Sequence, residues 1–393
     1  MRKRLRRGYR SWVVLLVGLA SLVCVPLAGA ATPGMRDVVL VGNAASGTVS
    51  FLDGHTWQNL GSMNVTPDPI SPSQQQQWDF FNQQEGGPRS VDDAIASPDG
   101  TKLYVSRANR GDVAAFDMVS HQMLWKTPCA GFRCDHMALS PDGSQLVVSA
   151  TLAEEAEVLD TQTGAVTATF PTGTFPHQND YSADGRYIFN ESIGNVALPH
   201  SEEALKGLRQ LTVVDAHTFQ PVHVCELQHG LRPTVFLPNG IAYMELSYLN
   251  GFVVFDTNSC TILHTINQPF RNGAASLPYD QYPLNSAHHG MALSGDGTRL
   301  CDVGTIDDYV AIVSTSTLKN ERIINVGRKP YWGQTSVDGN YCLVSNSDDN
   351  DVWVIQYDPP KAAAVVPVGA FPQRERLATV PDTVIANLSP TNG

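Results

Sequence analysis

The sequence predicts an all-β fold in which seven four-stranded antiparallel sheets form a ring. Three observations predict it: a turn phrase that recurs along the chain, short apolar strands after each copy, and a strand signal near the C-terminus that matches an earlier one. With 393 residues, of which 42% are hydrophobic and 16% charged, the chain has enough apolar side chains for a large core. The composition therefore argues against disorder.

The turn phrase reads Ser-Pro-Asp-Gly or a close variant and has six copies. Successive copies are 42 or 43 residues apart, except for two intervals of 55 and 57 residues. The copies begin at Ser97, Ser140, Ser182, Leu237, Ser294 and Ser336. A regular spacing of this length is typical of a repeat protein whose units are small sheets.

Each repeat contains signals for four strands. An apolar strand follows the phrase, as at residues 103–106, and a second strand ends in an acidic residue, as at 115–117. A third strand follows a turn such as residues 161–164, and a fourth precedes the phrase. The Asp-Gly and Asn-Gly pairs favour tight hairpins between them.

The repeat count predicts seven sheets. Residues 37–63 supply three strands without a turn phrase, and the stretch that begins at Phe371 resembles the one that begins at Phe175. Residues 373–382 are therefore expected to supply the missing inner strand, so that the two chain ends pair and leave no exposed sheet edge. The prediction is a seven-bladed β-propeller over residues 31–382, with a disordered tail at 383–393.

The N-terminus predicts export. Residues 1–10 are basic, residues 12–25 are apolar, and residues 28–30 are small, as in a secretory signal peptide covering residues 1–30. Its removal leaves 20 basic residues against 38 acidic ones. Such an acidic chain disfavours nucleic acid and anionic lipid as partners. We expect a periplasmic or secreted monomer without a membrane span, which binds a periplasmic protein or a small molecule.

The cysteines agree with an oxidising compartment. Six follow the predicted signal peptide: Cys129, Cys134, Cys225, Cys260, Cys301 and Cys342. Cys129 and Cys134 bracket a four-residue loop and are predicted to form a disulfide, whereas zinc binding is not favoured. The pairing of the other four stays open. The repeat predicts equivalent places for Cys301 and Cys342 in successive blades, with side chains that point the same way, so we do not expect a direct bond between them.

The repeats resemble a known family. The turn phrases and the stretch Tyr104-Val105-Ser106-Arg107-Ala108-Asn109, a variant of Tyr-Val-Thr-Asn, are similar to those of YVTN-repeat propellers, the surface-layer and YncE-like periplasmic proteins. The resemblance covers about residues 37–382 and implies fold far more strongly than activity. A looser resemblance extends to cytochrome-d1-type propellers, although no CxxCH haem motif occurs.

The propeller architecture predicts where a site lies. The innermost strand of each blade begins at the face that carries the longer connections, so the residues just before each turn phrase share one channel mouth. Four insertions are expected on that face: residues 65–88, the loop between Cys129 and Cys134, residues 191–209 and residues 267–287. Loops gathered on a rigid scaffold are where binding concentrates.

Histidines and acids near this mouth predict a metal site. His136, His177, His288 and His289 are the candidate ligands, and Asp93 and Asp180 are candidate catalytic bases. Neutral imidazoles with a carboxylate suit copper, zinc or iron. In the alternative interpretation, each histidine only hydrogen-bonds a neighbouring blade.

Arginines and aromatic residues predict ligand contacts. The candidates are Arg89, Arg232, Arg328, Arg374, Tyr331 and Trp332. Guanidinium groups bind carboxylates or phosphates, and the rings could stack on a planar ligand. Alternatively, the arginines pair with acids between blades and the rings fill the channel mouth.

Three functions follow from these patterns. The first is a non-catalytic exported propeller that binds a partner protein or a small ligand over its looped face. The second is a metal-dependent enzyme, either an oxidoreductase or a lyase or lactonase, that uses the histidines. The third is a propeller that holds a haem or related tetrapyrrole in the mouth, with a histidine as axial ligand.

Overall fold

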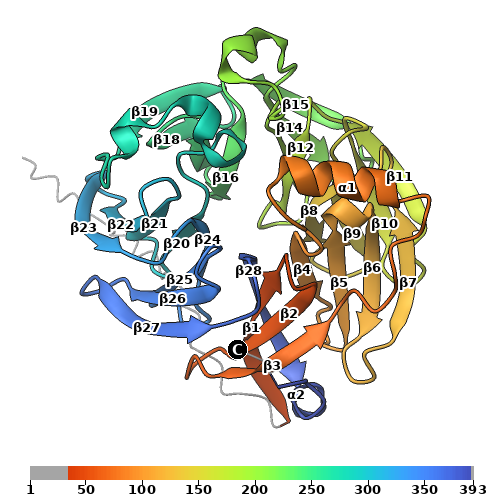
Figure 1. Ribbon diagram of the computed structural model, residues 1–393. Coiled ribbons are helices and arrows are strands. Elements are labelled where there is room, and N and C mark those ends of the chain that lie inside the picture. Colours follow the sequence, from red (N-terminus) through yellow and green to blue (C-terminus); the bar gives the residue numbers. More distant parts are fainter. Residues whose placement is uncertain (1–33, 391–393) are drawn as a thin grey trace, which may run out of the picture. The chain divides into compact units, whose positions relative to one another are not determined.

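The computed structural model describes residues 34–390, which fold into seven four-stranded antiparallel sheets around a central channel (Figure 1). This arrangement is a β-propeller with seven blades, as the repeat predicts. The predicted signal peptide, residues 1–30, lies outside the described residues. No helix among residues 34–390 has the length and apolarity that crossing a membrane requires.

Each blade runs from an inner strand to an outer one. In this order the first three blades are β28 (Pro372–Pro381), β1 (Met35–Asn43), β2 (Thr48–Asp53) and β3 (Asn59–Asn64); β4 (Asp93–Ala96), β5 (Lys102–Arg107), β6 (Asp112–Asp117) and β7 (Met123–Pro128); and β8 (Cys134–Leu139), β9 (Gln145–Ala150), β10 (Glu155–Asp160) and β11 (Val166–Pro171).

The next four blades are β12 (Pro176–Tyr181), β13 (Tyr187–Ser192), β14 (Gln210–Asp215) and β15 (Pro221–Glu226); β16 (Leu231–Phe236), β17 (Ile241–Leu246), β18 (Gly251–Asp256) and β19 (Thr261–Asn267); β20 (Met291–Leu293), β21 (Arg299–Gly304), β22 (Tyr309–Ser314) and β23 (Lys319–Asn325); and β24 (Pro330–Thr335), β25 (Tyr341–Asn346), β26 (Asp351–Gln356) and β27 (Lys361–Pro367). The helices are α1 (Gln75–Gln84) and α2 (Asp382–Ile385), with short 3₁₀ turns η1 (Ala108–Arg110), η2 (His200–Leu205), η3 (Ala274–Ser276), η4 (Tyr279–Gln281) and η5 (Pro283–Asn285).

The two ends of the described chain close the ring. β28 pairs with β1 in antiparallel register, from Met35 opposite Pro381 to Val41 opposite Glu375. The C-terminal strand thus becomes the inner strand of the first blade, which confirms the predicted closure. An open ring would instead leave unpaired sheet edges.

The serine, aspartate and glycine of each turn phrase stabilise the turn between the first two strands of a blade. In the first copy, Ser97 Oγ donates to Asp99 Oδ1 at 2.5 Å and accepts the backbone N–H of Lys102 at 3.0 Å. Gly100 has a φ of 68°, in the left-handed region that glycine adopts without strain. The phrase therefore fixes the hairpin between the first two strands of the blade, and the copy that begins at Ser140 has the same serine contacts.

The core lies between blades, because each sheet is covered on both faces. Along β21, Leu300 packs with residues of the preceding blade, whereas the next residue, Cys301, packs with the following blade. Successive side chains of a strand point to opposite faces, so an apolar run such as Leu146-Val147-Val148 of β9 contributes to the cores on both sides of its blade.

Three disulfides join the six cysteines of the described chain. Cys129–Cys134 is bonded as predicted, and Cys225–Cys260 links the outer parts of two neighbouring blades. Cys301 and Cys342 are also bonded, with Cα atoms 6.4 Å apart, so the expectation of no direct bond was wrong. Cys301 is the third residue of β21 but Cys342 is the second of β25, and this offset of one residue turns the two side chains toward each other.

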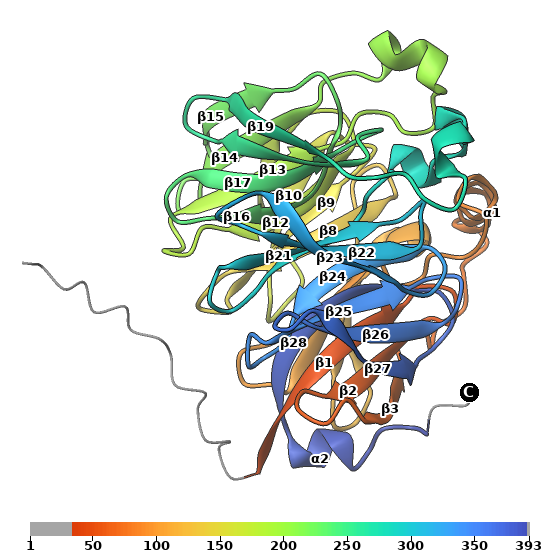
Figure 2. The same cartoon turned by 90° about the vertical axis from the view of Figure 1, so that its left-hand side faces the viewer.

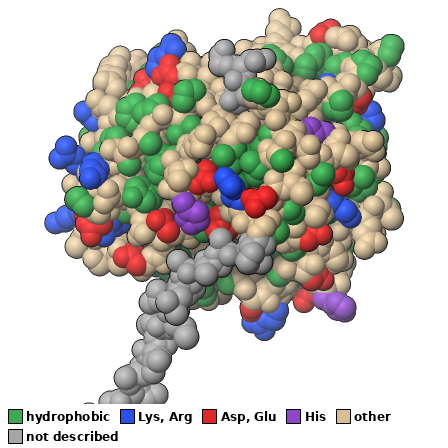
Figure 3. Space-filling view, turned by 90° about the horizontal axis from the view of Figure 1, so that it is seen from below, with side chains coloured by type: hydrophobic (Ala, Val, Ile, Leu, Met, Phe, Trp, Pro, Cys, Tyr) green, Lys and Arg blue, Asp and Glu red, His purple; other side chains and the backbone are tan. Residues whose placement is uncertain are grey.

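The insertions and the C-terminal segment complete the molecule. In Figure 2, α1 and the loop helices of the two later insertions lie on the same side of the propeller. At the end of the described chain, α2 covers residues 382–385 and the backbone of Ser389 pairs with Ser62 of β3. In the face shown in Figure 3, acidic and basic side chains are interspersed and form no continuous basic patch.

Three glutamates on inner or second strands are fully buried. They are Glu191, Glu245 and Glu375, and burial raises the pKa of each carboxyl well above its usual value. Glu191 and Glu245 are the fifth residues of β13 and β17, so the feature repeats in neighbouring blades. Both oxygens of Glu191 lack a hydrogen-bond partner, which favours the protonated form further.

The Cys301–Cys342 bond is expected to stabilise the fold more than the Cys129–Cys134 bond. The first spans 41 residues and the second spans 5. Loop-closure entropy predicts a loss of about 4 kcal/mol in unfolding free energy for the Cys301→Ala, Cys342→Ala variant and about 2 kcal/mol for Cys129→Ala, Cys134→Ala. Urea unfolding at neutral pH measures the unfolding free energy of both variants. A loss for Cys301→Ala, Cys342→Ala that is equal to or smaller than the loss for Cys129→Ala, Cys134→Ala would contradict the prediction.

Glu191→Gln is expected to become more stable, relative to the unsubstituted protein, as pH rises. The folded protein holds the Glu191 proton more tightly than the unfolded chain, so its stability falls above pH 4.5, the usual pKa of the group, by about 1.4 kcal/mol per pH unit until the folded-state pKa is passed. Glutamine cannot lose that proton. Denaturant unfolding from pH 4 to 9 measures the difference, with the exposed Glu226→Gln as control; parallel pH profiles for Glu191→Gln and the parent would count against a buried neutral carboxyl.

Candidate functional site

A cavity of about 430 Å³ opens at the channel mouth on the looped face. Its walls combine the first residues of inner strands from several blades with parts of all four insertions, as the architecture predicts. The residues that the argument uses are Phe81, Glu85, Arg89, Asp92, Arg133, Asp135, His136, His177, Arg232, Asn285, His289, Tyr331 and Trp332. A volume of this size suits a small molecule.

The insertion at residues 65–88 forms one rim of the cavity. Asp68 accepts hydrogen bonds from Arg107 at 2.5 Å and from Lys126 at 2.7 Å, and these cations hold the pKa of its carboxyl well below the usual range. This anchor positions α1, and the Phe81 ring stacks on Phe132 of the disulfide loop with centroids 6.0 Å apart. The first two insertions therefore meet over the mouth.

The insertions at 191–209 and 267–287 form the opposite rim. Lys206 is buried, and its Nζ donates to Tyr248 Oη at 2.7 Å and to Asn285 Oδ1 at 2.5 Å. The backbone N–H of His200 donates to Asp280 Oδ1 at 2.6 Å. A single buried ammonium group thus ties two loops that lie far apart in the sequence.

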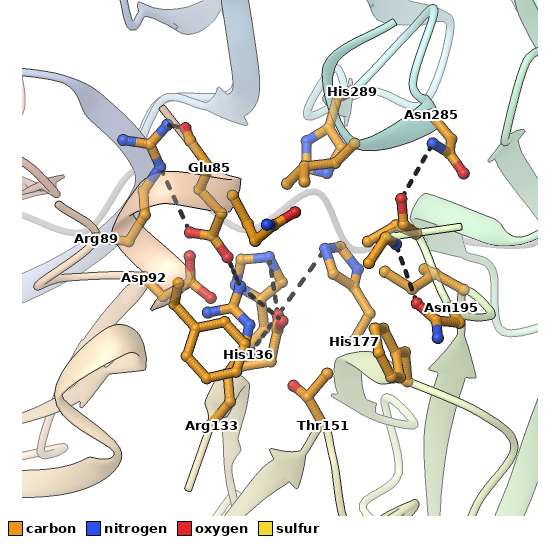
Figure 4. Close-up of a pocket in the computed structure, with 18 of the residues that line it drawn as sticks. Glu85, Arg89, Asp92, Arg133, His136, Thr151, His177, Asn195, Asn285 and His289 are labelled. Atoms are coloured by element: carbon orange, nitrogen blue, oxygen red, sulfur yellow. Dashed lines mark hydrogen bonds and ion pairs between the residues drawn. The ribbon is translucent and has the colours of Figure 1, made fainter. Parts of the chain in front are cut away.

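Three predicted histidines converge in the cavity (Figure 4). The ring centroids of His136 and His177 are 4.4 Å apart, and those of His177 and His289 are 5.4 Å apart. Burial lowers the pKa of all three well below the usual value, and nearby arginines lower it further. His289 Nδ1 donates to the carbonyl of Tyr331 at 2.9 Å, so its neutral ring carries the lone pair on Nε2.

A charged network lies beside the histidines. Arg133 Nη2 is 3.1 Å from Glu85 Oε1 and 3.7 Å from Asp135 Oδ2. Burial raises the pKa of Asp92 well above its usual value and the neighbouring Asp135 raises it further, while burial also raises the pKa of Asp135. Two buried carboxylates that repel each other in this way favour sharing one proton.

Arg232 is a buried cation without an acidic partner. Its Nε donates to Ser247 Oγ at 3.1 Å and its Nη2 donates to the carbonyl of Leu284, but no carboxylate of residues 34–390 lies within 4.0 Å of the guanidinium. Burial lowers its pKa. Arg89 differs, because its side chain contacts Glu85 and lies 3.6 Å over the Phe371 ring.

The two predicted aromatic residues also line the cavity. The Tyr331 ring stacks on His289 with centroids 4.2 Å apart. Trp332 lies 5.1 Å from the His136 ring and packs under the Arg374 guanidinium at 4.2 Å. These rings hold the imidazoles in place and give the polar site an apolar wall.

Four predicted site residues, Asp93, Asp180, His288 and Arg374, lie away from the cavity lining. Asp93 is bound by Arg376 at 2.7 Å and by Arg374 at 3.4 Å, which lowers its pKa despite its burial. Asp180 accepts a hydrogen bond from Gln178, and His288 contacts Asp302 of the same blade at 2.7 Å. Arg374 and Asp93 therefore fit the alternative interpretation, in which arginines pair with acids between blades.

The prediction for Arg328 was wrong in its placement. Its side chain is 69% exposed and pairs with Asp349 at 2.7 Å, outside the cavity. Arg328 precedes β24 by two residues, so it lies outside the inner strand whose first residues line the cavity. Distance along the sequence from the turn phrase was therefore not enough to predict whether Arg328 lines the cavity.

Several residues that line or support the cavity are not among the site residues that the sequence predicts. The repeat does predict that Asp92 and Asp135, which stand directly before Asp93 and His136, lie at the channel mouth, but neither is among the predicted ligands or bases. Glu85, Arg133 and Lys206 lie in insertions that have no counterpart in other repeats. Only the folded loops place them at the mouth.

Comparison of the chain with known proteins found no matching family model and no matching curated sequence. The chemistry of the cavity must therefore be inferred from its own residues.

Lys206→Met is expected to make the opposite rim, formed by the insertions at residues 191–209 and 267–287, more flexible. Tyr248 Oη and Asn285 Oδ1 lose a hydrogen bond to a charged donor, worth roughly 1.5–3 kcal/mol each. Amide hydrogen exchange in residues 191–209 and 267–287 should accelerate by about tenfold or more, while the exposed Lys361→Met leaves it unchanged. Unaltered protection in Lys206→Met would show that the ammonium does not tie the loops.

Proposed function

We propose that the protein is an exported YVTN-type propeller that binds a small anionic molecule in the cavity at its looped channel mouth. The observation that carries this proposal is the buried guanidinium of Arg232, which has no acidic partner among residues 34–390 and lies in the wall of the cavity. An unpaired buried charge is costly, and a ligand carboxylate or phosphate compensates it.

The rest of the lining suits a ligand with a planar or apolar body. Phe81, Tyr331 and Trp332 provide ring faces and edges, and the neutral imidazoles add hydrogen-bonding groups without adding charge. A concave site of this kind is typical of small-molecule binding. This favours a small ligand over a partner protein as the occupant.

Export has three supports. The N-terminal residues read as a signal peptide, all six cysteines of the described chain form disulfides, and the turn phrases resemble those of surface-layer and YncE-like periplasmic proteins. Disulfides persist in oxidising compartments such as the periplasm.

Of the two alternative functions, the metal-dependent one has a specific observation in its favour. Asp135, His136 and His177 offer ligand atoms that lie within 4.8 Å of one another. The bases predicted for such an enzyme, Asp93 and Asp180, do not line the cavity, so Asp92 is the better placed carboxyl group. No comparable observation favours a tetrapyrrole.

Arg232→Gln is expected to weaken anion binding by at least tenfold, because a hydrogen bond to a charged group contributes roughly 1.5–3 kcal/mol. Isothermal titration calorimetry with benzoate and phenyl phosphate measures the affinity, and benzyl alcohol serves as the uncharged counterpart. The anions should bind more tightly than the alcohol.

The matched control is Arg328→Gln, which removes the same charge from an exposed site outside the cavity. It should leave the affinity unchanged. Equal losses in the two variants, or no preference for the anions over benzyl alcohol, would refute a binding role for Arg232.

A further inference from the structure

The imidazoles of His136 and His177 are buried without hydrogen-bond partners. They are 4% and 6% exposed, and neither ring forms a hydrogen bond with any of residues 34–390. Asp135 Oδ1 lies 3.7 Å from His136 Nε2 and 3.9 Å from His177 Nε2. These distances are too long for hydrogen bonds, so the three side chains offer ligand atoms that are not bonded to one another.

We propose that Asp135, His136 and His177 bind one divalent transition-metal ion, zinc or copper, inside the cavity. Bonds from such an ion to nitrogen and carboxylate oxygen are about 2.0–2.2 Å long. Tetrahedral ligand atoms are then separated by roughly 3.3–3.5 Å. The observed gaps of 3.7 and 3.9 Å exceed this by only a few tenths of an ångström. This inference goes beyond anion binding by Arg232 and does not depend on it.

The charges that line the site favour a cation. The carboxyl groups of Asp92 and Asp135 line the same cavity as the two imidazoles, and a divalent cation bound among them would offset their negative charge. The positive charges of Arg133 and Arg374 would repel a bound cation. Their ion pairs with Glu85 and Asp93 reduce this repulsion.

The ion would leave positions open for a ligand. Three protein ligands with a free position are typical of catalytic rather than structural zinc sites. His289 lines the same cavity with its lone pair on Nε2, and Arg232 lines it as well. An anionic molecule could therefore contact both the metal and the guanidinium.

The two other clusters of ligating groups are weaker candidates. His223 lies 3.4 Å from Cys225 Sγ and 3.2 Å from Cys260 Sγ, but both sulfur atoms belong to a disulfide. His288 and Asp302 are fully buried and already bonded to each other. Neither cluster lines the cavity.

Metal-free full-length protein should bind one Zn²⁺ per chain in isothermal titration calorimetry without reductant. His177→Gln and Asp135→Asn should each weaken binding by at least tenfold, whereas the exposed His264→Gln should not change it. The electron paramagnetic resonance spectrum of the Cu²⁺ complex should show hyperfine coupling to imidazole nitrogen, and this coupling should be reduced in His177→Gln. Circular dichroism confirms that each variant is folded.

The proposal is overturned if the protein binds no stoichiometric Zn²⁺ or Cu²⁺, or if His177→Gln and Asp135→Asn bind the metal as tightly as His264→Gln does. Benzoate titration of the metal-free protein distinguishes this failure from a failure of anion binding. Benzoate binding without metal binding removes only the metal site, and metal binding without benzoate binding removes only the role of Arg232.

Discussion

Pairing of β28 with β1 is the constraint on which the rest of the molecule depends. Every blade is covered on both faces by its neighbours, so a ring left open would expose two apolar faces and two sheet edges. Asp93 strengthens the closure, because it accepts hydrogen bonds from Arg376 of β28 at 2.7 Å and from the backbone N–H of Met137 of β8 at 3.0 Å. One buried carboxylate therefore links three blades.

The closed ring explains the chemistry at its mouth. Inner strands that start at one face place His136, His177 and Arg232 around one opening, although these residues come from three blades. The insertions then narrow the opening on two sides. The anion proposal rests on the buried guanidinium of Arg232, which has no acidic partner among the described residues. The metal proposal rests on the buried imidazoles of His136 and His177, which have no hydrogen-bond partner there.

The repeat made the fold predictable, including the seventh blade and its closure. It also predicted that His136, His177, His289, Arg232, Tyr331 and Trp332 share one mouth, because an inner strand has the same place in every blade. It could not place Glu85 or Lys206, since inserted loops follow no repeat. The Cys301–Cys342 bond could also have been predicted, because Cys301 is the third residue of its strand and Cys342 the second. The repeat by itself gives the two cysteines equivalent places and hides this offset of one residue.

The central claim is that one cavity at the looped face collects the binding groups of the propeller. Anomalous diffraction from crystals soaked in bromide tests it most directly, because bromide occupies anion sites and can be located without assuming a ligand. The account predicts an ordered bromide in the cavity beside Arg232 that is absent in crystals of Arg232→Gln. Bromide found only on the outer surface, with an unoccupied channel mouth, would contradict it.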